Sequence, residues 1–249
     1  MKKLQTKRCP KCGKKIKVCQ CKKSSRKFLR IMALILFSSC SLVWYSHGKN
    51  KPVSPEDLIA NAKKGFTRAL ESLPDKEVQA HLLALTQKDD FVRYKLFNVP
   101  NPALYNTKQH VLGINAASNL WNTWPIETIW ATLVHENQHI LQDEKSGVSP
   151  IFLQTWRQKS EYTWNCEIDA MMAETLFAQK QGFFAQNYSE IAQIMSKENM
   201  DTKTAILVVA YPNLMRLEIY RPYWPYFPAI YNSQLPAQYR DKYGVANVN

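Results

Sequence analysis

IETIWATLVHENQHILQDE, residues 126–144, is the stretch that decides the fold. It contains no proline, and positions 137, 138 and 140 within it are uncharged. Apolar side chains flank its centre on both sides, at Leu133, Val134, Ile140 and Leu141. An exposed helix would place charges at several of these positions. The pattern therefore predicts a buried helix from roughly Ile126 to Asp143.

The centre of this helix carries a pattern typical of a metal site. His135 and His139 are four residues apart, so their imidazoles share one helical face and can reach one metal ion. Glu136 lies beside them, where it can take a proton from a metal-bound water. A catalytic zinc needs a third protein ligand, and no histidine follows His139, so we expect an acid. The earlier histidines, His47, His81 and His110, are expected to be ordinary ones.

With these residues the chain resembles the gluzincin metallopeptidases, whose third zinc ligand is a glutamate on a second helix. In small members, and in membrane-associated peptidases of the CAAX-prenyl-protease type, that helix carries a motif close to E-x-E-A-D. EIDAM, residues 167–171, places Glu167 at the ligand position, followed by Asp169 and Ala170 as in the motif. Met171 replaces the final Asp, which in the family holds a zinc-bound histidine. Asp169 or Glu174 could replace that Asp, and Glu161 is the fallback ligand.

The resemblance covers roughly residues 108–180 and implies an α+β, mostly helical, zincin-like metallopeptidase fold with a small early sheet. It implies a catalytic Zn²⁺ on His135, His139 and Glu167, with Glu136 as the general base of peptide-bond hydrolysis. HVLGIN, residues 110–115, resembles the edge strand along which such enzymes lay an extended substrate. The candidate donors to the oxyanion are Tyr162, Tyr211, Tyr220 and Arg221.

The remaining elements follow from local signals. Residues 46–54 are polar and indicate a linker, after which the metallopeptidase domain would span 55–249. Helices are predicted at 54–73, 76–86, 151–181 with a break near Trp164, 188–197 and 202–219. FVRYKLFNV (91–99) and HVLGIN are predicted strands, and NPALYN (101–106) between them a turn or loop. The proline-rich aromatic end, 220–236, cannot be one helix or strand, and we expect it to cover the core rather than line a cleft.

The net charge of +13 comes from one end of the chain. Residues 1–30 hold thirteen of the 33 basic side chains and none of the 20 acidic ones, so the remainder is neutral. A neutral body argues against nucleic acid as its partner. Within the tail, residues 1–27, the thiols of Cys9, Cys12, Cys19 and Cys21 are candidate ligands of a structural Zn²⁺; the alternative is a basic leader that binds no metal.

Residues 28–45 (FLRIMALILFSSCSLVWY) are predicted to form a transmembrane signal anchor. The basic residues before it would keep the N-terminus in the cytoplasm and place the domain on the outer side of the membrane. A lipoprotein acylated at Cys40 and a cleaved signal peptide are the alternatives.

Two functions from different classes remain open on the sequence. The first is a membrane-anchored zinc peptidase acting on a protein or peptide. The second is a non-catalytic, membrane-tethered adaptor with a zinc-binding tail and a relic metal site. The position of Glu167 distinguishes them, because only a metal site requires its carboxylate to face both imidazoles. Neither the physiological substrate nor the oligomeric state follows from the sequence.

Overall fold

In the computed structural model, residues 53–96, 101–117, 120–146 and 155–246 are described. Most of them are helical. The chain begins with α2 (Pro55–Glu71) and α3 (Lys76–Thr86), followed by a three-stranded sheet of β1 (Val92–Lys95), β2 (Ala103–Asn106) and β3 (Val111–Asn115). The short helix α4 (Leu120–Thr123) leads into α5 (Ile126–Ser146), the helix predicted from residues 126–144. The expectation of a mostly helical α+β protein with a small early sheet is thereby confirmed.

The second half of the molecule is helical throughout. It contains α6 (Trp156–Gln181), α7 (Phe184–Asn187), α8 (Ser189–Glu198) and α9 (Thr202–Leu214). A 3-10 segment, η2 (Glu218–Tyr223), then precedes α10 (Phe227–Gln234) and α11 (Ala237–Tyr243). The end 220–236 is divided between η2 and α10, with Pro222 and Pro228 inside them, so it is not one helix, as predicted.

Caps set several helix boundaries. The side chains of Ser54 and Asp75 accept hydrogen bonds from the first turns of α2 and α3. Thr155 and Gln158 form a reciprocal capping box at the start of α6, and Gly182 ends that helix with a left-handed φ of 83°. The predicted break near Trp164 is absent, since α6 is one continuous helix. Trp164 is fully buried in it, and its indole N–H donates to Gln234 of α10.

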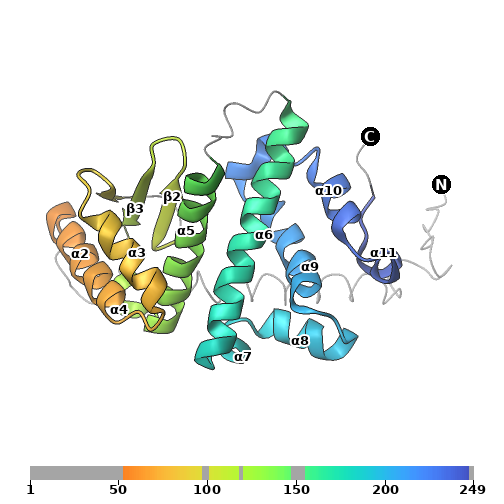
Figure 1. The fold of residues 1–249 in the computed structure, drawn as a ribbon, viewed down its shortest axis with the longest axis horizontal. Coiled ribbons are helices and arrows are strands. Elements are labelled where there is room, and N and C mark those ends of the chain that lie inside the picture. Colours follow the sequence, from red (N-terminus) through yellow and green to blue (C-terminus); the bar gives the residue numbers. More distant parts are fainter. Residues whose placement is uncertain (1–52, 97–100, 118–119, 147–154, 247–249) are drawn as a thin grey trace, which may run out of the picture. The chain divides into compact units, whose positions relative to one another are not determined.

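The sheet corrects two predictions. NPALYN, predicted as a turn or loop, contains β2. The strand order is β1-β3-β2, with β1 parallel and β2 antiparallel to β3, so the strand in HVLGIN is the central one and not an edge. The edge strand beside α5 is β2 (Figure 1). The Asn and Pro before β2 are strong turn signals, and the strand has only four residues. For these reasons the sequence pattern predicted a turn or loop there.

Helices α5 and α6 lie side by side at the middle of the molecule (Figure 1). On one side, α5 packs with α2, α3 and the sheet around a core that includes Phe66, Leu112 and Trp121. On the other side, α6 packs with α8, α9 and α10 around Trp164 and Phe227. A third apolar cluster joins α5 to α6. Any side chain at the α5–α6 seam is therefore held by two packed layers.

The predicted transmembrane helix requires correction. No helix in the described ranges is both long and apolar enough to cross a membrane. The longest of them, α6, has sufficient length but carries charged side chains from Arg157 to Lys180. The segment 28–45, to which the span was assigned, lies outside the described residues, and so do Cys9, Cys12, Cys19, Cys21 and Cys40.

Candidate metal centre

Three metal-ligating side chains converge at the seam between α5 and α6. His135 and His139 project from α5, and their Nε2 atoms are 3.1 Å apart. Glu167 projects from α6, with carboxylate oxygens 3.7 Å from Nε2 of His135 and 3.6 Å from Nε2 of His139. Candidate ligand atoms of all three residues lie within 4.8 Å of one another. The sequence-predicted third ligand is thus placed against both imidazoles.

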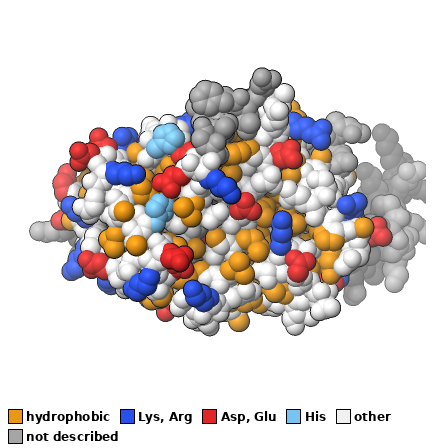
Figure 2. Space-filling model, viewed as in Figure 1, with side chains coloured by type: hydrophobic (Ala, Val, Ile, Leu, Met, Phe, Trp, Pro, Cys, Tyr) orange, Lys and Arg blue, Asp and Glu red, His pale blue; other side chains and the backbone are white. Residues whose placement is uncertain are grey.

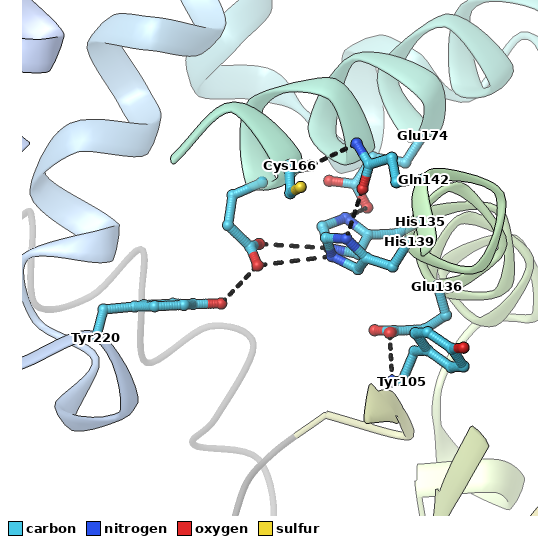
Figure 3. Close-up of polar contacts among 9 residues, drawn as sticks. Tyr105, His135, Glu136, His139, Gln142, Cys166, Glu174 and Tyr220 are labelled. Atoms are coloured by element: carbon cyan, nitrogen blue, oxygen red, sulfur yellow. Dashed lines mark hydrogen bonds and ion pairs between the residues drawn. The ribbon is translucent and has the colours of Figure 1, made fainter. Parts of the chain in front are cut away.

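The other ring nitrogen of each histidine has an acceptor beside it. Nδ1 of His135 is 3.4 Å from a carboxylate oxygen of Glu174, and Nδ1 of His139 is 3.1 Å from Oε1 of Gln142 (Figure 3). The Gln142 amide donates from Nε2 to the carbonyl of Cys166, which fixes its orientation. A carboxylate and an amide oxygen can only accept, so both Nδ1 atoms carry the proton. Both Nε2 atoms then present lone pairs to the same point.

This donor set fits a zinc ion. Two nitrogen ligands about 2.0 Å from a tetrahedral zinc lie about 3.3 Å from each other, close to the 3.1 Å between the two Nε2 atoms. Facing lone pairs repel unless a proton or a metal cation lies between them. Two imidazoles and one carboxylate are also a ligand set that zinc uses in catalytic sites. The side chains of His135, His139 and Glu167 are only 12–18% exposed, so water competes weakly for the position.

The charges of the site are strongly coupled. Burial alone would raise the pKa of Glu167, but the neighbouring imidazoles of His135 and His139 lower it to about 2. Burial alone would lower the pKa of His135, but Glu174 and Glu167 raise it well above its usual range. The Tyr220 hydroxyl donates to Glu167 Oε1 at 2.7 Å. Its pKa is raised by burial and by the charge of Glu167, so the phenol stays protonated.

Glu136 occupies a different position from the three ligands. Its side chain is 3% exposed, and its Oε2 accepts a 2.6 Å hydrogen bond from the backbone N–H of Tyr105 on β2 (Figure 3). Burial raises the pKa of Glu136, and the histidines and the Tyr105 N–H oppose that rise. A buried carboxylate with a raised pKa can both take and return a proton near neutral pH.

A pocket of about 370 Å³ opens beside the centre. His139 and Glu167 belong to its lining, together with residues of β2 and the following turn. The first half of α6 and η2 also contribute to the lining, including Tyr162, Ile219 and Tyr220. The metal position is therefore reachable from outside, as an open coordination site requires. The aromatic end of the chain both covers the core, through Phe227 and Tyr231, and lines this pocket.

Of the other predicted site residues, some line this pocket and others lie away from it. Tyr162 and Tyr220 line the pocket, whereas Tyr211 stacks on Tyr231 in the core and Arg221 is exposed beside Glu218. Of the candidates to replace the missing Asp, Glu174 contacts His135 and Asp169 is exposed. The fallback ligand Glu161 is exposed too. His81 and His110 pair with Asn137 and Asp143, away from the three ligands.

Sequence reasoning missed three contributors. Gln142 follows His139 by three residues on the same helical face, which is a detectable signal. Tyr105 lies on β2, which was predicted as a turn or loop. Tyr188, from the segment before α8, hydrogen-bonds to Glu174 and is brought there only by the tertiary fold. Comparisons with protein-family models, with curated proteins and with solved structures found no match.

Proposed function

We propose that the chain is a zinc-dependent peptidase of the gluzincin type with a zincin-like fold. The observation that carries the proposal is the convergence of His135, His139 and Glu167, with both Nδ1 atoms directed to acceptors. The neighbouring elements support it, since the helix with both histidines is flanked by an edge strand on one side and by the helix with Glu167 on the other.

The geometry also supports an extended peptide as the substrate. The N–H of Tyr105 points away from β3, toward Glu136. In an antiparallel ladder, the C=O of a residue points to the same side as its N–H, so the Tyr105 carbonyl also faces away from β3. That carbonyl can accept a hydrogen bond from the N–H of a peptide laid along β2, in the pocket that β2 lines.

In the proposed reaction each side chain has a defined task. His135, His139 and Glu167 would hold a zinc ion, which would act as a Lewis acid toward the peptide carbonyl and the attacking water. Glu136 accepts the proton of that water and delivers it to the leaving amine. Tyr220 has a protonated hydroxyl that lines the pocket and donates to Glu167; turned from Glu167 toward the substrate, this O–H would donate to the oxyanion. Glu174 and Gln142 keep the imidazoles in one tautomer.

The non-catalytic adaptor is less well supported. A relic site places no demand on the third ligand, yet the Glu167 carboxylate lies at nearly equal distances from the two Nε2 atoms. A buried base beside a metal position has no purpose in an adaptor either, because burying a carboxylate opposes folding.

The decisive experiment compares zinc content and peptide cleavage in three proteins: wild type, Glu136→Gln and Glu167→Ala. Because Cys9, Cys12, Cys19 and Cys21 can also bind zinc, the zinc lost between wild type and Glu167→Ala measures this site. We expect Glu136→Gln to keep that zinc and to lose about 100- to 10,000-fold in kcat on a fluorogenic peptide library. Glu161→Gln, on the same helix but exposed, should match wild type. Equal zinc in wild type and Glu167→Ala, or full activity of Glu136→Gln, would refute the proposal.

A further inference from the structure

Three short hydrogen bonds join the β2–β3 hairpin to α5, and two of them involve neither Glu136 nor any of the three candidate metal ligands. The backbone N–H of Tyr105 donates to Glu136 Oε2 at 2.6 Å, as described above. The hydroxyl of the same tyrosine donates to Asp143 Oδ2, also at 2.6 Å. Nδ1 of His110 lies 2.6 Å from that same oxygen. The Asp143 side chain is only 8% exposed, so solvent screens its bond to Tyr105 weakly, whereas the His110 side chain is 65% exposed.

Glu136 and Asp143 of α5 both accept hydrogen bonds from one residue of β2, Tyr105. Glu136 and Asp143 are seven residues apart, which is about two helical turns, so they lie on the same face of α5. Tyr105 bonds the first through its backbone and the second through its side chain. Two bonds separated along the helix prevent β2 from sliding or rotating against α5.

His110 adds a third bond between the hairpin and α5, at the turn that leads into β3. It is a non-glycine residue with a φ of 52°, a left-handed conformation that side chains other than glycine rarely adopt and that persists where contacts hold it. The turn before it is organised by Asn106, whose side chain accepts from the N–H groups of Lys108 and Gln109. Asp143 thus bonds residues of β2 and of the turn into β3, and ties the whole hairpin to α5.

The position of Glu136 depends on this attachment. A carboxylate whose Oε2 is occupied by an N–H presents its other oxygen in one direction, where it can handle a proton. If the hairpin moved, Tyr105 N–H would leave Glu136, and the carboxylate would rotate within its buried site. A displacement of about 1 Å at a reacting group can cost about 100-fold in rate.

We infer that Asp143 and Tyr105 are positioning residues for the proposed hydrolysis: they fasten the β2–β3 hairpin to α5 so that the Tyr105 N–H orients Glu136. The inference rests on the proposed function for its catalytic consequence. Its structural content, the fastening of the Tyr105 amide by Asp143, stands independently of any activity.

The test uses the full-length, zinc-loaded chain and the variants Tyr105→Phe and Asp143→Ala. Tyr105→Phe removes one hydroxyl and keeps the backbone N–H, so it is the milder change should Asp143→Ala fold poorly. We expect kcat to fall about 10- to 100-fold in both. The zinc content should be unchanged, since neither residue is a metal ligand. Tyr94→Phe, on the opposite edge strand of the same sheet, is the matched control and should retain the wild-type kcat.

Amide hydrogen exchange of β2 supplies the second measurement. The Tyr105 amide should exchange faster in Asp143→Ala, in Tyr105→Phe and in Glu136→Ala than in wild type, and Tyr94→Phe should leave it unchanged. A wild-type kcat in Tyr105→Phe, a raised KM with kcat intact, or unchanged exchange in all three variants would overturn the inference. If the zinc-loaded wild type cleaves no peptide, the proposed function fails. The exchange result alone then decides whether Asp143 fastens the Tyr105 amide.

Discussion

Glu174 acts on His135 in two opposing ways. It accepts from Nδ1 and so leaves Nε2 ready for a metal, but its negative charge also favours the protonated imidazole. Without a metal, burial lowers the pKa of His135 less than Glu174, Glu167 and Glu136 raise it, so the ring tends to hold a second proton. That proton occupies the lone pair that the metal needs. Metal binding must therefore release it.

The sign of the pH dependence follows. Below the raised pKa of His135, each unit of acidification should weaken the apparent zinc affinity about tenfold, whereas above that pKa the dependence should vanish. Glu174→Gln keeps an acceptor for Nδ1 but removes the charge, so the pKa of His135 falls and the affinity should change less near neutral pH. Competition with a chromogenic chelator over a pH series measures both slopes. Equal slopes in wild type and Glu174→Gln would show that Glu174 does not control the protonation of His135. Glu161→Gln, which removes an exposed charge from the same helix, is the control and should have the wild-type slope.

At the scale of elements, α6 connects the metal centre to the second core. Glu167 and Glu174 face α5, and Trp164, three residues before Glu167 in the same helix, packs into the second core. The Trp164 ring contacts Phe227 and Tyr231, with centroids 5.2 Å and 6.1 Å away. Its burial is complete, and it anchors the part of α6 that presents Glu167.

Replacing this anchor should destabilise the protein. Trp164→Ala leaves a large cavity and an unpaired Gln234 acceptor, so we expect it to lower the free energy of unfolding by about 3–5 kcal/mol. Trp156→Ala removes the same side chain from the same helix where it is 53% exposed, and should change that free energy by less than about 0.5 kcal/mol. Urea unfolding of the two variants measures the difference. Similar losses in both would mean that burial of Trp164 is not what holds α6.

The elements differ in how far local sequence could predict them. Helix 76–86 was predicted with its observed bounds, because the capping Asp75 and the spacing of Leu82 and Leu85 are local signals. β2 was missed, because a four-residue edge strand owes its conformation to pairing with β3 more than to its own residues. Glu167 was found through the family motif. Glu174 was named with Asp169 as a replacement for the missing Asp, and its contact with His135 confirms it. Sequence alone did not decide between the two, because the choice depends on which face of α6 packs against α5.

At the scale of the molecule, the candidate centre lies where two separately packed cores meet. The histidines belong to a helix packed on the sheet, and Glu167 to a helix packed on α8, α9 and α10. Acidic and basic side chains are interspersed on the face shown in Figure 2, in keeping with the near-neutral charge of the chain beyond residue 30. Long-range charge therefore adds little to holding the cores together. A bound metal, in contrast, would link them directly through α5 and α6.

Zinc should consequently stabilise the whole fold, and do so only through this link. With free zinc at about 100 times its dissociation constant, binding adds about 2.7 kcal/mol, which corresponds to a rise in Tm of roughly 5–10 °C for a chain of this size. Calorimetry of chelator-treated and zinc-loaded protein measures the rise. Glu167→Ala should abolish it, whereas Glu161→Ala, which removes an exposed acid from the same helix, should preserve it. Zinc held by the cysteines of residues 9–21 would affect all variants alike, so a rise that survives in Glu167→Ala would place the stabilising metal there and not between α5 and α6.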